Sequence, residues 1–534
     1  MKRYKIILLA IIALALFLRV FRLSDVPPGV NQDEASIGFT AYSLLQTGRD
    51  EYGHAWPLSF QSFGDWKLPL YIYTTIPFVA TLGMSELAVR LPSTIAGILT
   101  VIVAFFLVYE LFRSYRLSLL ASLLLAISPW HLHLSRVESE SNVAVFFTAT
   151  GFLLLLKGLH KHWLAVPGAI MLALTYYTYH GNHISTTLLL IGFIALYWRE
   201  AIKPKAFFYG ALLFIVLAGF ILSQTLAGAD RTKLSGIGLL GDPFVIHERI
   251  ELPRNDHGND SLTAVILHNR ITYAIETITK NYLKAFSPEF LFVSGGTNRA
   301  HNIPNFGNMY LIEAPFLLLG LFVCIANRKK KPFLFLLWWI LVSPVAASIT
   351  RDAPHTNRMF AIFPALPLVV ALGLNYFFNE ISFHKKSIVI GFVMMLFMIN
   401  IVVYMDRYYV HFPKNEAPSW GIGYKELLSY IDQPLQKSKT LIMANPETSP
   451  YIFLLFYGKE NPALFQQKAE HYDPTPDGFY HVRVFGRYQF RQIDWERDIF
   501  YPNALLVDYV ERVPDQYKPR MIRVAQFGVV PSYL

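Results

Sequence analysis

The chain opens with MKRYKIILLAIIALALFLRV (residues 1–20), an apolar run that begins after three basic residues. A helix needs about 20 mostly apolar residues to cross the hydrocarbon core of a bilayer. The run lacks the small-residue cleavage site of a secretory signal, and the polar stretch after it has the character of a structured segment. We therefore predict that it is a retained first membrane helix, near residues 5–22.

The composition of the whole chain favours lipid as the solvent for much of it. The 534 residues are 54% hydrophobic and 16% charged, with a mean hydropathy of +0.36, whereas a soluble protein carries about 25% charged residues. The net charge of +10 does not indicate nucleic-acid binding, because the Lys and Arg residues form small clusters between apolar runs. The single cysteine, Cys324, excludes an internal disulfide and a cysteine-built metal site.

Further apolar runs predict a polytopic α-helical membrane protein with about eleven membrane-spanning helices. The predicted spans lie near residues 5–22, 89–111, 116–134, 141–158, 163–179, 184–199, 205–223, 309–326, 333–349, 359–378 and 387–405. Basic residues are enriched in cytoplasmic loops. The proposed cytoplasmic ends carry sixteen of them: Lys2, Arg3, Lys5, Arg113, Arg116, Lys157, Lys161, Arg199, Lys203, Lys205, Arg328, Lys329, Lys330, Lys331, Lys385 and Lys386. The short turns on the other side carry three, so we predict a multi-pass protein of the cell membrane with a cytoplasmic N-terminus and an extracytoplasmic C-terminus.

This topology places the long polar segments on the extracytoplasmic side: loops 23–88 and 224–308 and the tail 406–534. Residues 70–84 are too few to span the bilayer comfortably, and we expect them to lie in its interface. Residues 261–286 have the spacing of an amphipathic surface helix. The tail alternates short strands, such as TLIMA (440–444), with helices. We predict a membrane domain at 1–405 and a soluble extracytoplasmic α/β domain at 406–534.

Two adjacent acids follow the first predicted helix, in GVNQDEASIGFTAYSLL (29–45). A carboxylate held at the edge of the bilayer can serve as a general base. Asp33 and Glu34 are therefore candidate catalytic residues. The alternative is that both acids simply complement the dipole at the start of a helix.

Later in the same loop, the segment DWKLPLY (65–71) offers candidate substrate-binding residues, Asp65, Lys67 and Tyr71. A lysine on the membrane side of an external loop can pair with a phosphate as a compact point charge. The alternative is a lysine whose stem lies in the interface while its ammonium group reaches water.

The predicted turn SRVESESN (135–142) carries Arg136 and Glu138. If this turn is helical, Glu138 and Asn142 share a face, because residues four apart lie above one another. Glu138 is then the candidate to face the first-loop acids, with Arg136 as a substrate-binding candidate. An ordinary polar turn is the alternative.

The predicted turn RDAPHTNRMF (351–360) carries Arg351, His355 and Arg358 on the extracytoplasmic side. Basic residues kept there run against the charge bias of the other loops. Because arginine forks match phosphate oxygens, the three residues are candidates for binding an anionic substrate. Contact with lipid headgroups is the alternative.

The order of these features resembles a known superfamily. An N-terminal helix followed by an external Asp33–Glu34, the element KLPLY (67–71), the turn SRVESE (135–140) and a late external turn with His355 and Arg358 look like the C-type (GT-C) glycosyltransferases. Within that superfamily, the chain resembles bacterial protein O-mannosyltransferases and lipid A aminoarabinose transferases, of the kind labelled family 39 or RgtA/B/C/D-like. The resemblance covers roughly residues 1–405, and KLPLY departs from the double-proline form of the family's element.

The resemblance implies an inverting glycosyltransferase that takes a hexosyl or pentosyl group from a polyprenyl-phosphate carrier. Asp33 matches the family's catalytic base, with Glu34 as its neighbour or substitute, and Glu138 matches a second acid that orients the acceptor or a metal. Lys67 matches the family's lysine, and Arg358 with His355 would hold the carrier phosphate. A divalent metal such as Mg²⁺ or Mn²⁺ is left open. The acceptor is a hydroxyl of a protein, a lipid or a polysaccharide.

Two other function classes compete with this interpretation. A multi-pass transporter or lipid flippase would place polar or charged residues near helix midpoints, whereas here they crowd one interface. A receptor or assembly module would need one anchoring helix. The sequence contains no Walker A loop and no GxSxG, HExxH or CxxC motif, which argues against soluble nucleotide-driven chemistry.

Overall fold

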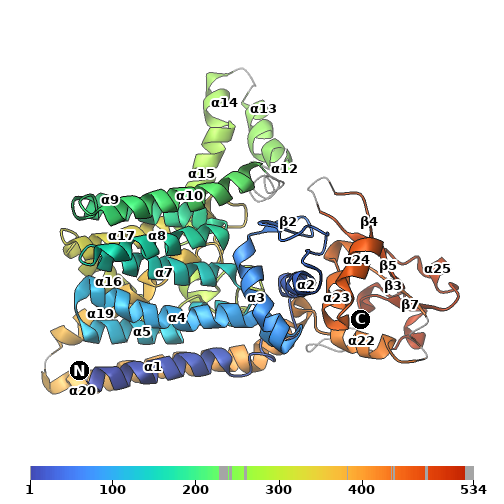
Figure 1. Cartoon of the computed structure of the whole chain (residues 1–534), viewed down its shortest axis with the longest axis horizontal. Helices are drawn as coiled ribbons and strands as arrows, with labels where there is room; N and C mark the ends of the chain where they lie inside the picture. The colour runs from blue at the N-terminus through green and yellow to red at the C-terminus, as the bar shows by residue number, and fades with distance from the viewer. Residues whose placement is uncertain are drawn as a thin grey trace. The chain divides into compact units, whose positions relative to one another are not determined.

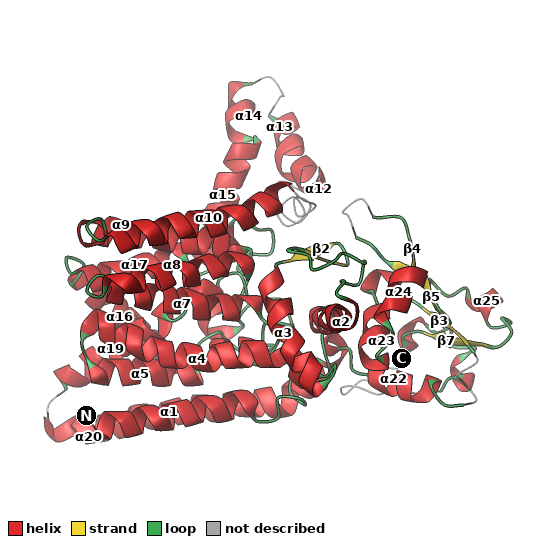
Figure 2. Ribbon diagram, viewed as in Figure 1, coloured by secondary structure: helices red, strands yellow, loops and turns green. Residues whose placement is uncertain are grey.

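The computed structural model describes residues 2–227, 239, 243–257, 261–381, 383–434, 436, 439–475 and 479–522. The chain forms two compact units. Unit 1 comprises Met1–Phe21, Ser93–Ser135 and Ser139–Tyr404, and unit 2 comprises Arg22–Pro92, Arg136–Glu138 and Met405–Leu534. Helices make up unit 1, and every strand among the described residues belongs to unit 2 (Figure 2).

Unit 1 is a bundle of long helices that run in roughly the same direction (Figure 1). Its helices are α1 (Lys2–Val20), α5 (Tyr115–Ile127), α6 (Pro129–Leu134), α7 (Glu140–Gly158), α8 (Ala165–Leu174), α9 (Gly181–Ala201), α10 (Lys205–Ala227), α16 (Ala314–Ala326), α17 (Lys331–Val342), α18 (Val345–Ser348) and α19 (Ala365–Glu380). The residues of α4 (Glu86–Phe112) and α20 (Phe383–Asp406) are divided between the two units.

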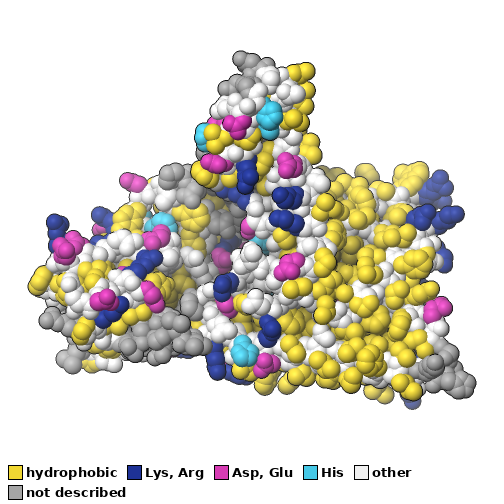
Figure 3. All heavy atoms as spheres, turned by 180° about the vertical axis from the view of Figure 1, so that it is seen from behind, with side chains coloured by type: hydrophobic (Ala, Val, Ile, Leu, Met, Phe, Trp, Pro, Cys, Tyr) yellow, Lys and Arg dark blue, Asp and Glu magenta, His cyan; other side chains and the backbone are white. Residues whose placement is uncertain are grey.

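Six helices of the described residues are long and apolar enough to cross a membrane. They are Glu86–Phe112, Glu140–Gly158, Gly181–Ala201, Lys205–Leu226, Lys331–Ser348 and Lys386–Asn415. Hydrophobic side chains cover the visible surface of the bundle, and Lys and Arg side chains gather at one end of it (Figure 3). The chain is therefore a multi-pass membrane protein. The count of eleven spans and the orientation of the termini stay predictions.

Glycines allow two helices of the bundle to pack closely. A Cβ atom at Gly320 of α16 would overlap the carbonyl of Val369 in α19, and one at Gly373 of α19 would overlap the carbonyl of Phe316. Small residues let helix backbones approach one another in lipid, where van der Waals packing rather than the hydrophobic effect drives association. The contact between α16 and α19 therefore depends on glycine at both positions.

A group of short helices from the predicted second loop projects from the bundle (Figure 1). It contains α12 (Pro243–Ile246), α13 (Leu252–Asp256), α14 (Leu262–Leu267) and α15 (Arg270–Lys284). The helix predicted over 261–286 is thus two helices, α14 and α15. Parts of the predicted loop, at 228–238, 240–242 and 258–260, lie outside the described residues.

Unit 2 contains the first predicted loop, which folds into α2 (Gln32–Thr47), a hairpin of β1 (Phe60–Ser62) and β2 (Asp65–Lys67), and α3 (Pro69–Leu82). The antiparallel hairpin pairs Phe60 with Lys67. Pro69 occupies the first turn of α3, where its missing N–H leaves no helical hydrogen bond unmade. The segment predicted to lie in the interface is α3, and its position in a membrane stays a prediction.

The tail also belongs to unit 2 and forms a mixed five-stranded sheet in the order β4-β5-β6-β3-β7. The predicted strand TLIMA is β3, which runs parallel to β6 and to β7. Its elements are α21 (Phe412–Asn415), α22 (Tyr424–Ile431), β3 (Thr440–Met443), α23 (Tyr451–Gly458), α24 (Pro462–Lys468), β4 (Glu470–His471), β5 (Val482–Phe485), β6 (Tyr488–Phe490), α25 (Trp495–Asp498) and β7 (Ala504–Val507).

Helix α2 of the first loop packs against α23 and α24 of the tail. Gly38 of α2 lies so close to the ring of Phe456 in α23 that a Cβ atom there would overlap it. The first loop and the tail therefore share one core within unit 2. The proposed independence of 406–534 as a soluble domain stays a prediction.

The predicted topology can be tested by cysteine labelling, because Cys324 is the single cysteine and is buried. In a Cys324→Ala background, we expect an impermeant maleimide to label Glu496→Cys from the extracytoplasmic side of sealed membranes. Lys330→Cys, at a predicted cytoplasmic end, should be labelled after permeabilisation. Both replaced side chains are exposed. Labelling of both variants from the same side would contradict the predicted orientation.

Candidate active site

The start of α2 places Asp33 and Glu34 in the first turn of a capped helix. The Asn31 side chain accepts a hydrogen bond from the backbone N–H of Glu34 at 2.8 Å. The Glu34 carboxylate in return accepts the N–H of Asn31 at 3.4 Å. This reciprocal capping satisfies two helix donors and fixes where the helix begins. Two neighbouring acids are thereby turned toward different surroundings.

Glu34 is fully buried in an ion pair with Arg90, which is also fully buried. Arg90 Nε and Nη2 donate to the two carboxylate oxygens, each at 2.9 Å. The backbone N–H of Glu138 donates to Glu34 Oε1 at 3.0 Å, which brings the second predicted acid to the first pair. Arg90 also donates to the backbone carbonyls of Leu23, Pro27 and Gly29. Glu34 thus accepts hydrogen bonds from both α4 and the 136–138 turn, which fixes the position of its carboxylate.

Asp33 has the opposite environment, because 54% of its side chain is exposed. Lys67 Nζ donates to Asp33 Oδ1 at 2.5 Å, while the Lys67 side chain itself is 7% exposed. Lys67 ends strand β2, so the hairpin sets the position of its ammonium group. A hydrogen-bonded carboxylate with an open side can accept a proton from a substrate hydroxyl.

The other two candidates of the first loop are Tyr71 and Asp65. Tyr71 is fully buried, and its hydroxyl donates to the carbonyl of Val89 at 2.9 Å. That bond anchors α3 to α4. The side chain of Asp65 lies outside the described residues.

The side chain of Arg136 is fully buried in unit 2, where it joins separate segments through hydrogen bonds. Its guanidinium donates to the carbonyl of Val26 at 2.9 Å and to the hydroxyl of Tyr408 at 3.2 Å. It also lies over the rings of Tyr408 and Tyr409, 5.4 and 5.3 Å from their centroids. These contacts hold the turn that carries the half-buried Glu138.

The 350–358 turn of unit 1 gathers the basic candidates. Arg358 donates to the hydroxyl of Thr350 at 2.8 Å and to the carboxylate of Asp352. His355 Nδ1 accepts the backbone N–H of Arg358 at 3.3 Å, and its Nε2 lies 3.6 Å from Asp352. Burial, together with the positive charge of Arg358, lowers the pKa of His355 to about 4. His355 is therefore neutral at pH 7, and the cationic side chains of the turn are Arg358 and the exposed Arg351.

Three asparagine side chains support this turn through hydrogen bonds. Asn302 Oδ1 accepts hydrogen bonds from the hydroxyl of Thr356 at 2.5 Å and from the N–H of Gly296 at 2.8 Å. Asn357 accepts the hydroxyl of Ser141. Asn281 of α15 donates to the carbonyls of Ser348 and Thr350 at 3.1 and 3.2 Å. Sequence reasoning missed all three asparagines.

The candidates therefore form two groups. Asp33, Glu34, Lys67, Arg136 and Glu138 come together in unit 2. Arg351, His355 and Arg358 come together in unit 1. Among the described residues, no three His, Cys, Asp or Glu side chains are grouped as metal ligands would be. In the described part of the chain, the Glu34 carboxylate is held by Arg90 through both of its oxygens.

Comparison with known proteins found one family model that matches part of the chain. Residues 9–218 match the family described as "Dolichyl-phosphate-mannose-protein mannosyltransferase". These residues form a domain of that family. The predicted resemblance to this group of C-type glycosyltransferases is confirmed. No curated protein sequence matches the chain.

Solved structures show the same fold over most of the chain. ArnT from Cupriavidus metallidurans in the apo state is 13% identical, with a TM-score of 0.54, and the match covers 98% of this chain and 96% of that one. ArnT of the same organism bound to undecaprenyl phosphate is 12% identical, with a TM-score of 0.53 and the same coverage.

The oligosaccharyltransferase of Archaeoglobus fulgidus, tethered to an acceptor peptide, is 14% identical with a TM-score of 0.50. The match covers 85% of this chain, which spans 63% of the length of the archaeal enzyme. At these identities, the likeness shows a shared GT-C fold.

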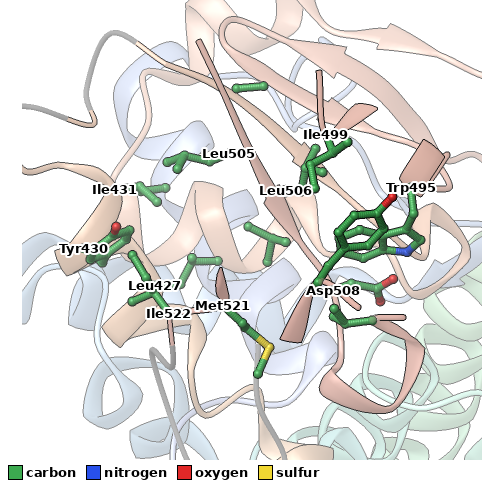
Figure 4. Close-up of a pocket in the computed structure, with 14 residues that line it drawn as sticks. Leu427, Tyr430, Ile431, Trp495, Ile499, Leu505, Leu506, Asp508, Met521 and Ile522 are labelled. Carbon is green, nitrogen blue, oxygen red and sulfur yellow. The ribbon is translucent and has the colours of Figure 1, made fainter. Parts of the chain in front are cut away.

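A cavity in the tail is separate from the predicted site residues. It has a volume of about 270 Å³ and lies in the tail, where residues of α22, α25, β7 and 513–522 surround it (Figure 4). Its lining is mostly apolar and aromatic, as with Leu427, Trp495 and Leu506, and includes none of the predicted site residues.

We expect Arg90→Met to destabilise the protein far more than Lys67→Met. Removing one partner of a buried ion pair leaves an uncompensated buried charge and costs roughly 3–5 kcal/mol. Losing Lys67 leaves Asp33 in contact with solvent, which hydrates its charge. Thermal unfolding of the purified variants in detergent measures the difference, and equal losses in Tm would contradict the anchoring role of Arg90.

Proposed function

We propose that this protein is a membrane glycosyltransferase that moves a sugar from a polyprenyl-phosphate carrier to an acceptor hydroxyl on the extracytoplasmic face. The family domain at residues 9–218 supports this activity, since its description names a dolichyl-phosphate-linked sugar donor. The ArnT structure of the same fold with undecaprenyl phosphate supports a polyprenyl carrier. The observation that carries the proposal is the pair formed by the exposed Asp33 carboxylate and the buried Lys67.

The proposed reaction is a single inverting displacement. The acceptor oxygen forms a bond to the anomeric carbon while the bond from that carbon to the carrier phosphate breaks. The electron pair of the broken bond leaves with the phosphate, and the acceptor proton passes to Asp33. Such a base contributes about 10²- to 10⁴-fold to the rate. Inversion follows because the acceptor attacks from the side opposite the departing phosphate.

The surrounding residues are assigned supporting roles. Lys67 orients the Asp33 carboxylate through its hydrogen bond and offers positive charge to the departing phosphate. Arg358 holds the carrier phosphate, with the neutral His355 fixing the Arg358 backbone. Glu138 orients the acceptor. The ion pair with Arg90 favours a positioning role for Glu34 over a proton-transfer role.

Asp33→Asn should reduce sugar transfer by at least about a hundredfold, because an amide cannot accept the proton. The protein should remain folded and inserted in the membrane, because the Asp33 side chain is largely exposed. Asp25→Asn is the matched control, since the Asp25 side chain is 62% exposed and pairs with Arg22 in the same unit. Normal turnover of a polyprenyl-phosphate-linked sugar by Asp33→Asn would remove Asp33 as the base.

Arg358→Ala should weaken donor binding more than acceptor binding, by roughly ten- to a hundredfold, since a charge-assisted hydrogen bond contributes about 1.5–3 kcal/mol. Titration of the purified protein with polyprenyl phosphate measures the loss. Arg328→Ala, at a predicted cytoplasmic end, provides the control. An unchanged donor affinity would contradict the phosphate role of Arg358. Mass spectrometry of glycolipids and glycoproteins from a deletion strain would identify the sugar and the acceptor.

A further inference from the structure

Helices α14 and α15 expose a row of large apolar side chains. Ile271 is 72% exposed and Ile275 is 62% exposed, one helical turn apart on α15. Four more belong to α14: Leu262, Val265, Ile266 and Leu267. On α15 the exposed charged residues Glu276, Lys280 and Lys284 follow one another at intervals of four. Residues four apart share a helix face, so α15 has one apolar side and one charged side.

A short corner holds α14 and α15 together as one piece. The Asn269 side chain accepts the N–H groups of Ile271 and Thr272 at 2.8 and 3.0 Å, which caps α15. Its amide group also donates to the carbonyls of Val265 and Ile266 at the end of α14. The apolar residues of the two helices therefore keep a fixed relation to one another.

The C-terminal half of α15 is attached to the end of a membrane-spanning helix. Asn281 donates to the carbonyl of Ser348, the last residue of the span Lys331–Ser348. The hydroxyl of Tyr282 donates to the carbonyl of Leu341 in the same span at 2.8 Å. Because a span ends where the hydrocarbon core gives way to headgroups, these bonds fix α15 at the level of the membrane interface.

The direction of the two helices fits the same level. In Figure 1, α14 and α15 project from the bundle and run across the direction of α9 and α10, which are both candidate spans. A helix that runs across the spans runs along the bilayer surface. In Figure 3, hydrophobic side chains lie along the edge of this projecting arm on the side toward the bundle, where the surrounding bilayer would extend.

We propose that the apolar face of α14–α15 docks on the lipid bilayer and forms a membrane-surface arm of unit 1. Lipid is the occupant that the observations favour, because the arm is fixed to a span end, runs across the spans and turns its apolar side toward them. The charged side chains of Glu276, Lys280 and Lys284 lie on the opposite side of α15, which would face water. The inference rests on the membrane position of unit 1 and does not require the proposed transfer reaction.

A fluorescent probe can report the surroundings of each side of α15. In a Cys324→Ala background, Ile271→Cys and Lys280→Cys are labelled separately with an environment-sensitive nitrobenzoxadiazole maleimide. The full-length protein is then reconstituted into vesicles of equal parts phosphatidylcholine and phosphatidylglycerol. We expect a blue-shifted emission at position 271 that lipids carrying a nitroxide on the acyl chain quench several-fold. The matched probe at position 280 should emit as in water and resist that quenching.

Two outcomes would overturn the proposal. A probe at position 271 that emits as in water would mean that the face stays solvated. A blue-shifted probe that the nitroxide lipids do not quench would mean that protein, from this chain or a second copy, covers the face. Neither outcome depends on sugar transfer, so a protein without transferase activity whose probe at 271 is quenched by lipid would still support the arm.

Discussion

The buried ion pair between Glu34 and Arg90 is the contact on which the geometry of the acidic site depends. Both side chains are fully buried and form a bidentate contact. Glu34 also accepts the backbone N–H of Glu138, and Arg90 also donates to the carbonyls of Leu23, Pro27 and Gly29. An isolated buried charge is costly, whereas a pair with satisfied hydrogen bonds is tolerated. The start of α2, the first turns of α4 and the 136–138 turn are therefore held in one arrangement.

This arrangement gives two adjacent acids different chemistry. Successive residues at the start of a helix point in different directions, so Glu34 turns inward to Arg90 and Asp33 turns outward to Lys67 and solvent. Both oxygens of the inward acid accept hydrogen bonds from Arg90. The outward acid keeps an open side, which a substrate hydroxyl could approach. Position on the helix, rather than residue type, thus separates the two roles.

The 350–358 turn of unit 1 is built differently, with neutral side chains that support it and an ion pair between Arg358 and Asp352. Asn281, Asn302 and Asn357 satisfy its backbone and hydroxyl groups, while burial and the charge of Arg358 keep His355 neutral. The positive charges of the turn therefore come from Arg351 and Arg358, and Asp352 pairs with the latter. The same Asn281 bonds join this turn to α15, which also carries the exposed Ile271 and Ile275. The proposed membrane-surface arm and the 350–358 turn are therefore joined through one side chain.

The sequence by itself determined that the chain is a helical membrane protein and a relative of the C-type glycosyltransferases, because apolar runs, charge bias and ordered motifs are local features. It also indicated strand β3 and the candidate residues Asp33, Lys67 and Arg358. Only the tertiary structure decided that Glu34 forms a buried ion pair with Arg90. It also decided that the buried side chains of Tyr71 and Arg136 donate hydrogen bonds to backbone carbonyls. The packing of the first loop into one core with the tail was likewise decided only by the tertiary structure. Those outcomes depend on which distant groups meet when side chains are buried, and no local pattern of residues records such a meeting.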